Sequence, residues 1–165
     1  MRKKILILLM LFSLLTLTAC EKKETNNSDA IKFKEEYESK NDTLKSVSIS
    51  SNNPFIYKTA DDIINMKNNK ETFLVFIGKS DDELSRDSIE SLISVSYDND
   101  LDTIYYVNSD YDKLFELIDK SEAIPVVFNV LNGEVEDVSF DLNKDGIEDI
   151  IKDTVETLNT CNSEC

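Results

Sequence analysis

The chain has 165 residues, three cysteines, no histidine and a formal net charge of −15. This length suits one domain with a hydrophobic core of its own. A strongly acidic surface repels phosphate groups, which argues against nucleic-acid binding and against a basic membrane-binding patch. The absence of histidine excludes catalytic triads, general bases and metal sites that depend on an imidazole.

The first twenty residues have the three parts of a secretory signal. Residues 2–4 are cationic, residues 5–15 form an apolar run too short to span a bilayer comfortably, and Thr18 and Ala19 are small. Small residues directly before a cysteine resemble the processing site of bacterial lipoproteins, in which the cysteine thiol carries diacylglycerol. We therefore expect cleavage before Cys20 and a lipid-anchored protein on the outer face of the cytoplasmic membrane.

The segment after the signal is polar and then becomes amphipathic. Apolar residues at helical spacing predict a helix over residues 28–40. The alternation of Val47 and Ile49 predicts a short strand, and the Asn53-Pro54 pair predicts a turn.

Helical and strand patterns alternate from residue 59 onward. Thr59 followed by Asp62 predicts a capping box, and the Asn132-Gly133 pair is a strong hairpin signal. Continuous apolar runs are typical of strands that are buried on both faces. The expected elements, in chain order, are a helix over 60–68, a strand over 72–77, a helix over 82–97, a strand over 103–107, a helix carrying 114–118, strands over 126–131 and 135–140, and a helix over 146–158.

This order predicts an α/β fold. Strands that alternate with helices run parallel, whereas a hairpin adds an antiparallel edge. The result is a mixed β-sheet of about four or five strands, flanked by helices on both faces.

The element order also carries a resemblance to a known family. With Ile124-Pro125 before the third expected strand and Asn132-Gly133 in the hairpin, residues 55–158 resemble thioredoxin. The segment FIGKSDDELSR is similar to the active-site strand and loop of thioredoxin-like lipoproteins from low-GC Gram-positive bacteria. The resemblance implies a cis peptide bond before Pro125.

The sequence departs from that family at its redox motif. The two positions of Cys-x-x-Cys fall on Asp82 and Ser85, with Glu83 and Leu84 between them. Disulfide exchange needs a thiolate and a second, resolving thiol, so this loop lacks the chemistry. We expect it to be a plain helix start, with Ser80 and Glu83 forming a capping box. The alternative is other chemistry at Asp82 and Ser85, for which the sequence shows no base or oxyanion partner nearby.

Ile124 and Pro125 are the candidate peptide-binding residues. In thioredoxin relatives, the backbone before the cis-proline pairs with an extended peptide, so the resemblance implies the same for Ile124. The alternative is that Pro125 only shapes the turn.

The two cysteines that remain lie at the C-terminus. Cys161 and Cys165 can form a disulfide in an oxidising compartment, where it would act as a passive staple. Alternatively, the two thiols are a relocated redox pair.

One acidic segment resembles a calcium loop. Its candidate ligands are Asp141, Asn143, Asp145, the carbonyl of Ile147, and Asp149. A lysine replaces the bidentate glutamate of an EF-hand. The alternative is an ordinary loop in which Asn143 or Asp145 caps the last helix.

These observations predict a non-catalytic, lipid-anchored protein that needs no cofactor and binds a protein or peptide partner. The alternatives are a thiol–disulfide oxidoreductase that uses Cys161 and Cys165, and a calcium-dependent interaction module. The expected organisation is a signal peptide at 1–19, a lipid-anchored tether at 20–27, a helical extension and linker at 28–54, a thioredoxin-like domain at 55–160 and a cysteine-containing tail at 161–165.

Overall fold

A computed structural model describes residues 27–38, 47–118 and 123–163. Within these ranges, no helix is both long enough and apolar enough to cross a membrane. The elements, in chain order, are α2 (Asn27–Glu38), β1 (Phe55–Tyr57), α3 (Ala60–Asn68), β2 (Phe73–Ile77), α4 (Glu83–Asp98), β3 (Ile104–Val107), α5 (Asp112–Ile118), β4 (Val126–Leu131), β5 (Glu134–Ser139) and α6 (Lys144–Ser163).

The strands form one mixed sheet in the order β1-β3-β2-β4-β5. Strands β1, β3 and β2 are parallel, β4 runs antiparallel to β2, and β5 runs antiparallel to β4. Asn132 and Gly133 both have positive φ, of 53° and 85°, as a two-residue hairpin of the type I′ class requires. The α/β class and the mixed sheet are therefore confirmed.

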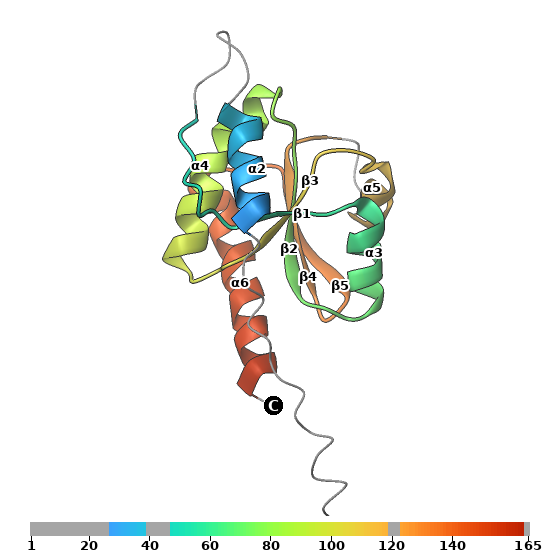
Figure 1. The fold of residues 1–165 in the computed structure, drawn as a ribbon. Helices are drawn as coiled ribbons and strands as arrows, with labels where there is room; N and C mark the ends of the chain where they lie inside the picture. The colour runs from blue at the N-terminus through green and yellow to red at the C-terminus, as the bar shows by residue number, and fades with distance from the viewer. Residues whose placement is uncertain (1–26, 39–46, 119–122, 164–165) are drawn as a thin grey trace, which may run out of the picture.

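Helices cover both faces of this sheet, as Figure 1 shows. Helices α2, α4 and α6 pack on one face, and α3 and α5 pack on the other. Strand β2 serves both cores, since Leu74 and Phe76 point to the first face while Val75 and Ile77 point to the second. This double burial explains why the strand is apolar throughout.

The expected strand in the segment before α3 is wrong. Val47 and Ile49 are buried but form no strand, because α2 satisfies the backbone there: the Ile49 amide donates to Glu38 Oε1 at 3.0 Å, and Lys34 Nζ donates to the Ile49 carbonyl at 2.6 Å. The edge strand is instead β1, which pairs with β3 and is only three residues long. Such a short strand leaves no periodic pattern in the sequence.

The start of α3 agrees with the sequence. Thr59 caps α3, and its side chain and that of Asp62 form the expected reciprocal capping box.

Helix α2 packs directly on the sheet: the Phe33 ring stacks on Phe55 with centroids 3.9 Å apart. The segment from residue 27 to 38 is thus built into the same core as the strands.

Candidate functional site

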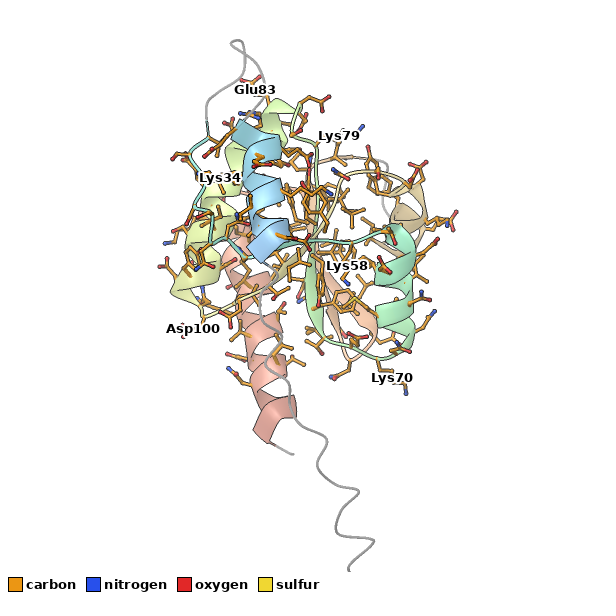
Figure 2. The ribbon with its side chains drawn as sticks, in the orientation of Figure 1. Lys34, Lys58, Lys70, Lys79, Glu83 and Asp100 are labelled. Atoms are coloured by element: carbon orange, nitrogen blue, oxygen red, sulfur yellow. The ribbon has the colours of Figure 1, made fainter. Side chains whose placement is uncertain are left out.

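The altered loop and the proline turn lie at one end of the sheet. Ile77 of β2 is paired with Val126 of β4. The loop that follows Ile77 therefore starts beside Pro125, which directly precedes Val126. The Ile124–Pro125 peptide bond is cis, as the resemblance implies. Figure 2 places Lys79 and Glu83 at this end of the molecule, and Lys70 and Asp100 at the opposite end.

The start of α4 differs from the expected capping box. The N-cap is Asp82 rather than Ser80, because the helix begins at Glu83, too late for a box between Ser80 and Glu83. Asp82 Oδ2 accepts hydrogen bonds from the Ser85 amide and the Ser85 hydroxyl, each at 2.7 Å. The Ser85 oxygen in turn accepts the Lys79 amide at 3.1 Å. The carboxylate and hydroxyl thus hold the loop together.

A buried arginine, which was not among the predicted site residues, lies beneath this loop. Arg86 is only 1% exposed, and its Nη1 donates to the Ser80 carbonyl at 2.9 Å. Its guanidinium carbon is 5.9 Å from the centroid of the Tyr37 ring. The spacing could have revealed it, since Arg86 is three residues before Ile89 on the buried face of the helix.

A groove opens beside the loop. It has a volume of about 310 Å³ and lies between the first half of α4, the cis-proline and the segment that joins β5 to α6. Leu84, which is 64% exposed, and Phe140, which is 39% exposed, both line it. The remaining lining residues are Asp87, Ser88, Ser91, Pro125, Asp141, Leu142 and Asn143.

The groove joins residues that the sequence keeps far apart. Leu84 and Pro125 belong to the two segments named from the resemblance, whereas Phe140 and Leu142 were not anticipated as site residues. The one signal for them in the sequence was that both are apolar and lie just after the last strand. A second cavity, of about 360 Å³, lies at the other end of the sheet near Leu74 and Leu158, and none of the anticipated site residues lines it.

The side chain of Lys79 lies on the side of the loop that faces Tyr111. Its ammonium lies 5.4 Å from the centroid of the Tyr111 ring. A hydrogen bond with Tyr111 raises the pKa of Lys79 above its ordinary value. This lysine is therefore held toward α5, away from the groove of Leu84.

Position 161 is remote from the groove along the axis of α6. Asn143 lines the groove and directly precedes α6, whereas Cys161 belongs to the last turn of that helix. At 1.5 Å per residue, the two positions are about 27 Å apart along the helix. Figure 1 shows the last turns of α6 extending past the sheet toward the C-terminus. Cys20 and Cys165 lie outside the described residues, so the lipid anchor and the disulfide stay predictions.

The candidate calcium segment forms the start of α6. Asn143 Oδ1 accepts the Gly146 amide at 2.8 Å, which is the helix-capping arrangement. Asp145 lies in the first turn, Ile147 is buried in the core, and Asp149 lies further along the helix. The described part of the chain contains no group of three potential metal-ligating side chains. Calcium binding by this segment stays a prediction.

Comparison with known proteins supports the fold. No family model matches the chain, and no curated protein matches its sequence. A solved structure of a proposed oxidoreductase with a thioredoxin fold matches with a TM-score of 0.51 and 15% identity, covering 59% of this chain and 93% of that chain. The protein therefore has a thioredoxin-like fold.

Two further solved structures are similar. Oxidised thioredoxin O2 from Arabidopsis thaliana has a TM-score of 0.49 and 11% identity, and covers 61% of this chain and 94% of its own. Oxidised thioredoxin from Plasmodium falciparum has a TM-score of 0.48 and 12% identity, and covers 61% of this chain and 99% of its own.

Proposed function

We propose that this protein is a lipid-anchored, redox-inactive thioredoxin-like protein that binds an extended segment of a partner protein beside Pro125. The observation that supports this most directly is the groove itself. Leu84 is the most exposed of the large apolar side chains within the described residues, and it lies in one groove with Pro125 and Phe140. Exposed apolar side chains gathered in a concave site are typical of protein-binding surfaces.

Loss of redox chemistry follows from the loop. Disulfide exchange begins with a thiolate whose attack forms a mixed disulfide, which a second thiol then resolves. At the positions carried over from the family, Asp82 and Ser85 instead hydrogen bond to each other. Cys161 stands about 27 Å along α6 from the groove, so a thiol there would not act on a segment bound at Leu84.

The lipid anchor is proposed from the signal sequence. Cys20 follows Ala19 in a lipoprotein-like processing site, and the tether of residues 20–27 leads into α2. Since the chain is acidic, attachment would come from the lipid rather than from electrostatic attraction to anionic headgroups. The groove would then face partners at the outer membrane surface.

Photo-crosslinking in intact cells tests this function. A photoreactive amino acid in place of Leu84 should give a defined adduct with one partner, whereas the same substitution at Ile31 should not. Ile31 is the matched control because it is also a large apolar residue, is 39% exposed and lies on α2.

Two results would contradict the proposal. One is an identical adduct pattern from positions 84 and 31, and the other is no adduct at all from position 84. A Cys20→Ser variant tests the lipid anchor. The variant protein should leave the membrane fraction, and its retention there would rule out the proposed lipid attachment.

A further inference from the structure

The cavity near Leu74 and Leu158 lies between three segments of the chain. These are the start of β2, the segment that joins α4 to β3, and the second half of α6. The cavity has a volume of about 360 Å³, which is in the range of small-molecule sites. Figure 2 places Asp100, one of its lining residues, at the opposite end of the molecule from Lys79 and Glu83.

Apolar side chains form the inner walls of this cavity. Leu74 and Leu101 are buried in the core beneath α4 and α6. Val155 and Leu158 of α6 pack against the same core but are only partly buried. A ligand with an apolar body would remove the remaining surface of Val155 and Leu158 from water, which favours binding.

Three carboxylates line the same cavity. Glu71 directly precedes the start of β2, and Asp100 and Asp102 precede β3, while the lining includes no lysine or arginine. Among the residues that the structure describes, no side chain forms an ion pair or a hydrogen bond with any of these carboxylates. The adjacent Lys70 directs the stem of its side chain to the hairpin, where a Cβ on Gly133 would lie 3.3 Å from Lys70 Cγ. The potential in the cavity is therefore negative and favours a cation.

Asp100 is an unfavourable residue for its position in the fold. It follows Asn99, the C-cap of α4, and has a φ of 57°, where glycine or asparagine is usual. Its carboxylate lies at the negative end of the α4 dipole, and the last turn of α4 contains no basic residue. A residue that costs stability in this way, without a partner among the described residues, is expected where a ligand supplies the partner.

We propose that this cavity binds a small organic cation that consists of a primary ammonium group on an apolar body. The ammonium group would lie beside Asp100 and Asp102, and the apolar body would cover Val155 and Leu158. The site lies at the opposite end of the sheet from the groove of Leu84, so it is independent of the peptide-binding function proposed above.

Charge and geometry argue against other occupants. A second copy of this chain would bring a net charge of −15 to a cavity lined by carboxylates, which disfavours self-association there. Anionic ligands would be repelled for the same reason. The described part of the chain has no group of three side chains placed to hold a metal ion, so the three carboxylates do not form a metal site. A small amine matches both the charge and the apolar walls.

An NMR titration of the full chain in neutral detergent micelles tests the inference. The three ligands are phenethylammonium, phenethyl alcohol and hydrocinnamate, which share an apolar body and differ in charge. The ammonium ligand should bind about tenfold more tightly than the alcohol, and the carboxylate ligand should bind more weakly than the alcohol. The backbone amides that shift should be those of Leu74, Leu101 and Leu158, and added salt should narrow the differences in affinity.

A matched pair of double variants locates the charge effect. Asp100→Asn with Asp102→Asn should weaken binding of the ammonium ligand about fivefold and leave the alcohol unaffected. This variant should be at least as stable as the parent protein, because it removes a carboxylate from the negative end of α4 and asparagine accepts a positive φ. Glu90→Gln with Glu116→Gln makes the same change in net charge at exposed positions outside the cavity, and it should leave all three affinities unchanged.

A third variant separates the apolar walls from the carboxylates. Leu158→Ala should weaken the ammonium ligand and the alcohol alike, because both would lose the same apolar contact. Equal affinities of the three ligands, equal losses in the two double variants, or amide shifts confined to the groove of Leu84 would overturn the inference. It would also be overturned if the ammonium ligand caused no shift up to about 10 mM, or if Asp100→Asn with Asp102→Asn lowered the thermal midpoint.

Discussion

Asp82 is the N-cap of α4, at a position where a chemical role was conceivable. Its carboxylate accepts both the amide and the hydroxyl of Ser85. The Lys79 amide completes the arrangement by donating to the same hydroxyl. Because each group has a partner within the loop, Asp82 acts as the helix cap of α4.

Replacement of this cap should reduce stability. We expect Asp82→Ala to lower the free energy of unfolding by about 1 kcal/mol, because α4 loses its N-cap hydrogen bond. Asp82→Asn keeps an acceptor oxygen and should cost less. The measurement is urea denaturation followed by circular dichroism.

The neighbouring Asp81→Ala variant is the control, since Asp81 is exposed and does not cap the helix. It should change stability by less than about 0.5 kcal/mol. Similar losses for Asp81→Ala and Asp82→Ala would contradict the assignment of the cap.

Among the elements, α2 is tied to the sheet by a partly buried network of aromatic rings and one carboxylate. Glu36 accepts hydrogen bonds from the hydroxyls of Tyr57 and Tyr106, and Tyr37 donates to the Tyr106 oxygen at 3.2 Å. Burial raises the pKa of Tyr37, Tyr57 and Tyr106 well above the ordinary value. Nearby Glu36 raises them further, because a second negative charge there is unfavourable.

This network predicts a loss of stability at high pH. Phenols whose folded-state pKa is raised contribute stability that is complete below their unfolded value of 10.0 and is lost as the pH rises above it. The thermal midpoint should therefore begin to fall near pH 10 and keep falling as the pH rises further. Tyr106→Phe removes one of the ionisable groups and should make this fall shallower.

Tyr97→Phe is the control for removing a tyrosine, because Tyr97 is 51% exposed on α4. Above pH 10, its thermal midpoint should fall with rising pH as steeply as that of the parent protein. If the Tyr106→Phe and Tyr97→Phe variants lost stability with the same slope, the buried network would not be the cause.

At the scale of the whole molecule, the thioredoxin-like framework remains around the altered loop. A long helix still starts after β2, and a cis-proline still precedes β4 beside that start. Cysteines placed at positions 82 and 85 would lie one helical turn apart at the positive end of α4. That location lowers the pKa of a thiol and favours the thiolate.

Two cysteines introduced at positions 82 and 85 should therefore give thiol–disulfide exchange activity. We expect Asp82→Cys with Ser85→Cys, in a chain whose other three cysteines are serine, to form a reversible disulfide and to reduce insulin more than about tenfold above the parent background. Thiol titration and the insulin turbidity assay measure the two effects.

The single Asp82→Cys variant is the control, since it lacks a resolving thiol. Failure of the double variant to form a disulfide, with its fold intact, would show that these positions are not equivalent to the family's redox pair. Insulin reduction by the unaltered chain would instead favour chemistry at Cys161 and Cys165.

Features that depend on neighbouring residues could be predicted from the sequence alone. Local geometry and the period of burial give rise to the capping box of Thr59, the positive-φ pair at Asn132 and Gly133, and the apolar runs of β2 and β4. Their alternation was enough to establish the α/β class and the mixed sheet. The proposed lipid-attachment signal is likewise a local pattern, within residues 1–20.

Features that depend on distant partners follow instead from the three-dimensional packing of the chain. Strand β1 exists because β3 pairs with it, and Val47 and Ile49 stay outside the sheet because α2 side chains bond to the backbone at Ile49. The groove exists because pairing of β2 with β4 brings Pro125 to Leu84, while the β5 hairpin returns Phe140 to the same place. Such contacts join segments tens of residues apart, and no local pattern encodes them.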